Sequence, residues 1–214
     1  MRSETIRRII RAYDDPVVRG YCWLRFGILR QRFLDEIGQY LPASGAVLDI
    51  GCGFGLFSLY YAATGPGRIL RGLDLDARRI AMARRAASRL GLDNVAYEVG
   101  DARDFKGDGE VQAAYMLDIV HHIPADAVPP LLDALRCCLP AGGRLLVKDV
   151  DTRPAPKRWF TWALDKLMAP RSPVHYWPAE ILTARLEAAG FRVYRHLMVD
   201  LLPYPHVLYV AEAA

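Results

Sequence analysis

The chain has 214 residues, 52% of them hydrophobic, and a formal net charge of +4 at pH 7, which predicts one domain with a substantial core. No apolar run reaches the roughly 18 residues that a bilayer-spanning helix needs, and residues 1–5 lack the apolar core of a signal peptide. The four cysteines show neither C-x-x-C spacing nor histidine partners, which argues against a zinc site and favours reduced cytoplasmic thiols.

Basic charge is concentrated in two segments. Residues 1–40 hold eight Arg against five acidic residues, and residues 152–171 hold five Lys or Arg against one Asp. Such segments favour an acidic partner or weak peripheral contact with a membrane surface, and ordinary solvated helix faces are the alternative.

Two helices are expected before the first strand. The stripe of Ile6, Ile9 and Ile10 predicts a short amphipathic helix over residues 3–12, and the residue before Pro16 leaves the helical region. A longer helix is expected over about 17–40. Its predicted apolar set is Val18, Tyr21, Cys22, Leu24, Phe26, Leu29, Phe33, Ile37 and Leu41. Residues 1–42 are therefore expected to form a helical lid on a second unit, residues 43–214.

Residues 47–58 predict a strand, a glycine-rich turn and a helix. Asp49 ends the apolar strand, and three glycines then alternate at Gly51, Gly53 and Gly55. Glycines allow a ligand to approach the backbone closely, and the following helix N-terminus favours a carboxylate or phosphate. A dinucleotide site would have its third glycine at Leu56, and Asp49 would repel a pyrophosphate but suit an ammonium group. A carboxylate, an ammonium and a ribose together describe S-adenosylmethionine; a generic glycine-rich turn is the alternative.

This stretch resembles motif I of the class I S-adenosylmethionine-dependent methyltransferases, whose pattern hh-D-h-G-x-G-x-G it meets in full. Further signatures follow in the family's order. Asp74 and Leu75 end a second strand over 68–76, where the resemblance implies that the acid accepts ribose hydroxyls. Asp101 and Ala102 follow a third strand over 95–99 and would meet the adenine. The cofactor residues implied in the turn are Asp49, Gly51, Cys52, Gly53 and Gly55.

A fourth strand is expected over 111–118, with Leu117 and Asp118 at its end, where the family's backbone faces the methionine part of the cofactor. His121 and His122 come next. A histidine here can act as a base, although helix capping or packing against the cofactor is the alternative. The predicted elements that follow are helices over 77–90, 125–139 and 178–190, a fifth strand over 144–150, and an antiparallel pair over 191–199 and 207–211.

Residues 152–177 are an insertion in this pattern. Residues 157–168 mix aromatic and basic side chains at helical spacing, which suits a membrane-interface belt, an apolar acceptor pocket or plain core packing. His175 and Tyr176 follow in a proline-flanked loop that is expected either to fold over the active site or to be a surface fragment. We expect His121, His122 and His175 as candidate bases, with Tyr13 and Tyr176 as positioning groups.

The predicted fold is α/β: a Rossmann-like, seven-stranded, mostly parallel sheet with helices on both faces, an antiparallel last strand and an N-terminal helical lid. The resemblance implies methyl transfer from S-adenosylmethionine to a small organic acceptor, aromatic or lipid-like, with no metal. A nucleic-acid methyltransferase is disfavoured because no Asn/Asp-Pro-Pro-aromatic motif follows the fourth strand. A catalytically silent, cofactor-binding partner subunit is the other alternative, and the oligomeric state is left open.

Overall fold

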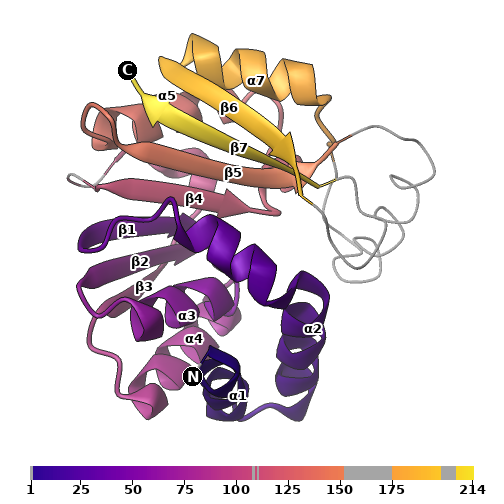
Figure 1. Cartoon of the computed structure of the whole chain (residues 1–214), viewed down its shortest axis with the longest axis vertical. Coiled ribbons are helices and arrows are strands. Elements are labelled where there is room, and N and C mark those ends of the chain that lie inside the picture. Colours follow the sequence, from indigo (N-terminus) through magenta and orange to yellow (C-terminus); the bar gives the residue numbers. More distant parts are fainter. Residues whose placement is uncertain (1, 108, 110, 152–174, 199–205) are drawn as a thin grey trace.

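The computed structural model describes residues 2–107, 109, 111–151, 175–198 and 206–214. A seven-stranded sheet runs through the molecule in the order β3-β2-β1-β4-β5-β7-β6 (Figure 1). The strands are β1 (Gly45–Ile50), β2 (Arg68–Asp74), β3 (Val95–Val99), β4 (Ala113–Leu117), β5 (Arg144–Val150), β6 (Phe191–Leu197) and β7 (His206–Ala213). Strand β7 is antiparallel to both β5 and β6, whereas the pairs from β3 to β5 are parallel. The predicted sheet is confirmed.

Helices cover both faces of the sheet (Figure 1). They are α1 (Arg2–Ala12), α2 (Pro16–Gly38), α3 (Leu56–Thr64), α4 (Ala77–Leu90), α5 (Val128–Cys138) and α7 (Ala179–Ala188), with short 3-10 turns η1 (Ala102–Asp104) and η2 (Val120–His122). Because side chains alternate along a strand, Tyr115 and Leu146 join the hydrophobic cluster of α1 to α4. Their neighbours Met116 and Val147 join the cluster of α5 and α7.

Capping residues set several element bounds. The Asp76 side chain accepts hydrogen bonds from two backbone N–H groups in the first turn of α4, and Gly91 ends that helix at φ +65. Asp15 caps α2 in the same way, with Pro16 in its first turn. These local signals explain why the predicted helix over 77–90 has the bounds found here. The predicted strands over 95–99 and 144–150 also have the bounds found here.

Other bounds differ from the prediction. Strand β4 is shorter than 111–118 at both ends, and it ends at Leu117 because Asp118 adopts φ +59, a left-handed conformation that leaves the strand. Helix α5 begins at Val128 rather than at residue 125. Leu24, expected among the apolar contacts of α2, is exposed. The predicted helical segment over 157–168 and residue Val199 lie outside the described residues.

The N-terminal helices are bonded to distant parts of the chain. Asp14, between α1 and α2, forms ion pairs with Arg85 and Arg89 of α4. At the other end of α2, the Glu36 carboxylate lies 2.5 Å from His196 Nε2 on β6. Helices α1 and α2 therefore rest on the layer of α3 and α4 and reach across to the far strands. Across the part of the chain that the structure describes, no helix is both long and apolar enough to cross a membrane.

Candidate active site

The glycine-rich turn after β1 has left-handed backbone at three alternate positions. Gly51 and Gly55 adopt φ +75 and +76, and a Cβ there would lie 2.5 Å from Ile119 Cγ1 and from the Tyr97 hydroxyl, respectively. Gly53 adopts φ +56, but a Cβ there would meet no atom within 4 Å. Two glycines therefore allow the turn to pack against the protein, while Gly53 faces open space in which a ligand can approach.

Asp74 links this turn to the end of β2. Its Oδ2 accepts a hydrogen bond of 2.8 Å from the Gly53 N–H, and its Oδ1 accepts one of 2.9 Å from the Asp76 N–H. Each carboxylate oxygen has a second lone pair, so the acid can still accept ribose hydroxyls. Leu75 is exposed beside it. The sequence placed these two residues at the same strand end, and the structure brings them to the turn.

Asp49 lies in the interior beneath the glycine-rich turn. The buried carboxylate accepts hydrogen bonds from Ser58 Oγ at 2.7 Å and from the Tyr115 hydroxyl at 2.9 Å. Burial raises its pKa to about 7. Both bonds use Oδ2 and tie β1 to α3 and β4 beneath the turn, and contact between Asp49 and a ligand ammonium stays a prediction. Cys52 is also buried, and burial raises the pKa of its thiol.

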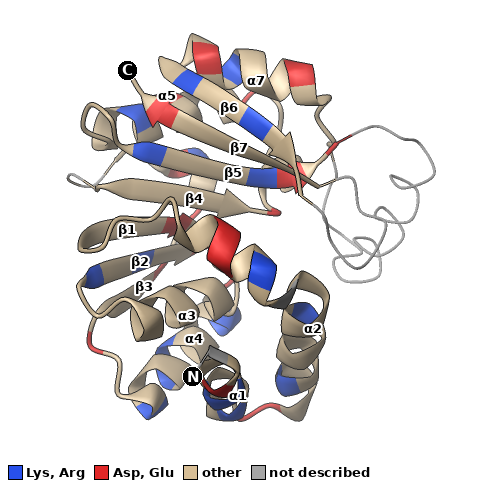
Figure 2. Cartoon of the chain, viewed as in Figure 1, with Lys and Arg blue, Asp and Glu red and all other residues tan. Residues whose placement is uncertain are grey.

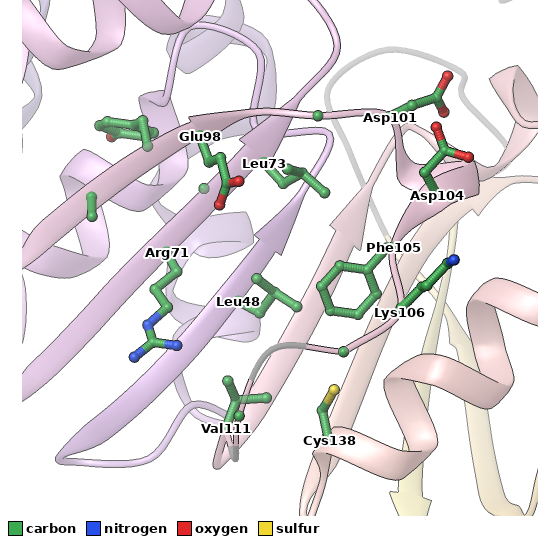
Figure 3. A pocket seen from close by; sticks show the side chains of 16 residues that line it. Leu48, Arg71, Leu73, Glu98, Asp101, Asp104, Phe105, Lys106, Val111 and Cys138 are labelled. Atoms are coloured by element: carbon green, nitrogen blue, oxygen red, sulfur yellow. The ribbon is translucent and has the colours of Figure 1, made fainter.

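Asp101 follows β3 and caps η1. The side chain of Arg103 donates to its carboxylate, and this hydrogen bond lowers the pKa of Asp101. Ala102 is half-buried next to it. Of the residues predicted to contact the cofactor, Asp101 is the one that lines a cavity of about 730 Å³ on the side of the sheet covered by α5. Leu48, Leu73, Phe105 and Cys138 also line this cavity (Figure 3).

A cluster of charged groups holds the end of β4. Leu117 is buried, and the Asp118 carboxylate that follows contacts Lys148 Nζ at 2.5 Å and pairs with Arg25 of α2. Burial alone would raise the pKa of Asp118, but the charges of Lys148 and Arg25 outweigh it and hold that pKa well below its usual range. These ion pairs stabilise a residue whose backbone conformation costs about 1–3 kcal/mol. Nothing in the sequence indicated that Arg25 would reach this strand end.

Four of the five predicted catalytic residues lie together at the ends of β4 and β5. His121 Nδ1 is 2.5 Å from Asp149 Oδ1, and the His121 N–H donates to Asp149 Oδ2 at 3.0 Å. The His121 ring centroid is 4.1 Å from that of His122 and 5.5 Å from that of Tyr176. The His175 N–H donates to the His121 carbonyl at 2.7 Å.

Sequence reasoning missed Asp149, the partner of His121. The signal was weak: charged residues at the end of the fifth strand indicate a functional edge, but they do not say which side chain they meet. Asp149 and His121 are 3% and 2% exposed, so this pair forms part of the interior beneath the cluster. His122 is half-buried and is the more accessible imidazole.

Tyr13 lies elsewhere. The Tyr13 hydroxyl donates a hydrogen bond of 2.7 Å to the carbonyl of Phe54, which lies between Gly53 and Gly55 in the glycine-rich turn. Burial of Tyr13 raises the pKa of its hydroxyl well above the usual value. This bond fastens the N-terminal helices onto the cofactor turn, and a role of Tyr13 in positioning an acceptor stays a prediction. Among the described residues, no group of three or more His, Cys, Asp or Glu side chains is placed to hold a metal ion.

Comparison with known proteins gives the class to which this fold and turn belong. A family described as "Methyltransferase domain" matches residues 25–196. The O-methyltransferase family protein from Burkholderia thailandensis has a TM-score of 0.70 at 18% identity, over 87% of this chain and 56% of that one. Magnesium protoporphyrin IX methyltransferase from Synechocystis, solved with S-adenosylhomocysteine, has a TM-score of 0.66 at 18% identity, over 86% of this chain and 83% of that one.

Curated relatives match shorter segments. The ubiquinone biosynthesis O-methyltransferase of Xanthomonas axonopodis is 28% identical over 71% of this chain and 64% of its own length. The 2-heptyl-1-hydroxyquinolin-4(1H)-one methyltransferase of Mycobacteroides abscessus is 35% identical over 38% of this chain and 36% of its own. A 23S rRNA (uracil(747)-C(5))-methyltransferase of Shewanella oneidensis is 37% identical over 37% of this chain and 20% of its own. The match thus spans less than two thirds of each relative.

The fold and its glycine-rich turn define the class I, Rossmann-like methyltransferases. The chain belongs to the methyltransferase domain family, and S-adenosylmethionine is its cofactor. The residues present fit that molecule, because Gly53 leaves open backbone directly beside the Asp74 carboxylate. Leu75 adds an exposed apolar side chain at the same edge.

Proposed function

We propose that the chain transfers the methyl group of S-adenosylmethionine to a hydroxyl group of a small aromatic or lipid-like acceptor. The observation that carries this proposal is the cluster of His121, His122 and Tyr176 over Asp149. A hydroxyl must lose its proton during methylation, and His122, the accessible imidazole of this cluster, can accept it. Two of the relatives named above are, by their names, an O-methyltransferase and a hydroxyquinolinone methyltransferase, which supports the same acceptor class.

In this proposal His122 accepts the acceptor's proton, because it is the more accessible of the two imidazoles. Asp149 holds His121 through two hydrogen bonds, one with the ring Nδ1 and one with the backbone N–H, and the His121 ring packs against that of His122. Asp149 and His121 are thus positioning residues. The bound cofactor would supply an electrophilic methyl group, and its own thioether sulfur would be the leaving group. The chain's task is then to orient the acceptor, exclude water and hold the released proton.

The test uses methyl-labelled S-adenosylmethionine with a panel of phenols, hydroxyquinolones and long-chain hydroquinones, and with total RNA in a parallel reaction. We expect label on a hydroxyl oxygen of a small acceptor. His122→Ala should then lower kcat roughly 10²-fold or more. Asp149→Asn should lower kcat and alter its pH profile, while S-adenosylhomocysteine affinity stays within about twofold, or ~0.4 kcal/mol. His196→Ala, a half-exposed histidine on β6, is the matched control and should leave kcat and its pH profile unchanged.

A nucleic-acid acceptor is the second candidate, favoured by the match to the rRNA methyltransferase. Label found in RNA, with none on the small-molecule panel, would replace the proposal by this alternative. A silent partner subunit is the third candidate. One structural neighbour is a putative methyltransferase in complex with an activator from Haloferax volcanii. Cofactor binding without turnover on any acceptor would favour this third reading.

A further inference from the structure

The outer face of the first half of α2 is apolar and open to solvent. Val17, Trp23 and Leu24 are 78%, 70% and 50% exposed. At Gly20 and Gly27, on the same helix, an added Cβ would meet no atom within 4 Å. Single exposed apolar residues are ordinary, but three large ones within eight residues, including a tryptophan, form a patch.

Helical geometry places these five residues on one side. Each residue advances about 100° around the helix, so Val17 and Leu24, seven residues apart, are nearly in line. Gly20 and Gly27 fall beside them, and Trp23 marks the border of an arc of about 120°. Residues 16–28 place no charged side chain in this arc. A surface helix normally turns charged and polar residues outward, so this face of α2 is unusual.

Arginines are concentrated at the end of the molecule that carries this apolar face (Figure 2). Residues 2–32 hold eight Arg against three acidic residues, and α4 holds five Arg and no acidic residue. Arg7, Arg8 and Arg11 of α1 and Arg19 of α2 are exposed. Figure 2 shows the basic residues of α1, α4 and the first half of α2 at the same end of the molecule, the lower end in that view. Apolar contact area and positive charge are thus offered together.

We propose that this end of the molecule, the α1–α2 face, docks on the surface of an anionic lipid bilayer. Val17, Trp23 and Leu24 would enter the interfacial region while the arginines of α1 and α2 meet the headgroups. Tryptophan favours this interface because its ring is apolar and its N–H is polar. Basic helices with one apolar face bind anionic membranes in this way, with both terms adding to affinity.

Charge argues against a second copy of the chain as the occupant. A two-fold dimer would place this face against itself and bring two identical arginine clusters together, where like charges repel. An anionic bilayer neutralises the same arginines. Docking would also bear on the site already described: the turn before α2 carries Tyr13, bonded to Phe54, and α2 itself carries Arg25, paired with Asp118. The inference does not depend on which acceptor is methylated.

The test is flotation of the full chain with large unilamellar vesicles of phosphatidylcholine alone or with 30 mol% phosphatidylglycerol, at low and high salt. We expect binding to the anionic vesicles only, weakened by salt because surface charges are screened. Trp23→Ser and Leu24→Ser should each lower the partition coefficient, for Trp23 by about tenfold or more. Leu197→Ser is the matched control, since Leu197 of β6 is also a leucine and is 69% exposed. The double variant Arg8→Gln/Arg11→Gln should weaken binding more than Arg192→Gln/Arg195→Gln on β6.

Circular dichroism and S-adenosylhomocysteine affinity establish that each variant folds. The proposal is overturned if the folded chain does not float with anionic vesicles, or if Leu24→Ser and Leu197→Ser bind them equally well. Sedimentation equilibrium adds a second arm. A dimer that dissociates in Trp23→Ser would assign the face to a second copy, and tight binding of an unrelated RNA that is lost in Trp23→Ser would assign it to nucleic acid. Either result would replace the bilayer.

Discussion

Three glycine-to-alanine substitutions separate the structural from the ligand-binding function of the cofactor turn. Gly53, Gly55 and Gly91 all have left-handed backbone, at φ +56, +76 and +65, so alanine at each costs about 1–2 kcal/mol of folding free energy. They differ in what the new methyl group meets. At Gly53 and Gly91 it meets no atom within 4 Å, whereas at Gly55 it lies 2.5 Å from the hydroxyl of buried Tyr97.

The expected results follow from these surroundings. Gly55→Ala should lower the free energy of unfolding by about 2–5 kcal/mol, because overpacking adds to the backbone strain. Gly53→Ala and Gly91→Ala should each lose about 1–2 kcal/mol. Gly53→Ala should also weaken S-adenosylhomocysteine binding by about 1–3 kcal/mol, because its methyl group enters the space that the ligand needs. Gly91→Ala should leave that binding unchanged. Gly53→Val should abolish binding.

Urea denaturation gives the stabilities, and titration calorimetry with S-adenosylhomocysteine gives the affinities. Gly91, at the end of α4, is the control for left-handed strain away from the turn. If Gly53→Ala binds the ligand as tightly as Gly91→Ala does, the open space at Gly53 is not the ligand's position. If Gly55→Ala is no less stable than Gly53→Ala, Tyr97 is not fixed as the structure shows.

Three further predictions concern the acids of the cofactor site and the loop beside the histidines. Asp74→Ala should weaken S-adenosylhomocysteine binding by about 1.5–3 kcal/mol in calorimetry, and saturating competition by NAD would contradict the cofactor assignment. Because burial raises the pKa of Asp49 to about 7, the folded chain keeps a proton that the unfolded chain releases near pH 4, so this group's contribution to stability falls as pH rises from 4 to 7. Urea titrations should show that slope, up to about 1.4 kcal/mol per pH unit, reduced in Asp49→Asn, and an unchanged slope would refute it. His175→Ala or Tyr176→Phe should lower turnover on the identified acceptor with cofactor affinity within about twofold, and full activity in both would place the acceptor pocket under the N-terminal helices instead.

Local signals explain what the sequence predicted well. Helix α4 is bounded by Asp76 and Gly91, whose side-chain and backbone preferences act within a few residues. The ordered glycines and the acid at the end of β2 likewise identify a cofactor turn, because ligand chemistry restricts those residue types. The order of the strands in the sheet then follows, because helical crossovers between parallel strands are right-handed and allow few arrangements.

Contacts between distant residues explain what could not be predicted. The Asp49 carboxylate accepts hydrogen bonds from the hydroxyls of Ser58 and Tyr115, and Tyr115 lies 66 residues away in the sequence. Asp149 reaches His121 across two strands, and Arg25 meets Asp118 across 93 residues. No periodicity or spacing reports such pairs. Leu24 was misjudged for the same reason, since residue type alone does not say which residues will pack against a side chain.

The long reach of α2 has a consequence for how the chain acquires its fold. Arg25 pairs with Asp118, which in turn pairs with Lys148, and Glu36 pairs with His196 on β6. During synthesis, helices α1 and α2 leave the ribosome well before those strands exist, with Cys22, Leu29 and Phe33 uncovered. Contacts of such high sequence separation form late and slow the final step. The packing of α2 on α3 can form earlier, because Phe33 contacts Phe57 and Leu34 accepts from Tyr61. We therefore expect a nascent chain that ends before β5 to hold α2 on α3 while both ends of the helix still lack their partners on the far strands.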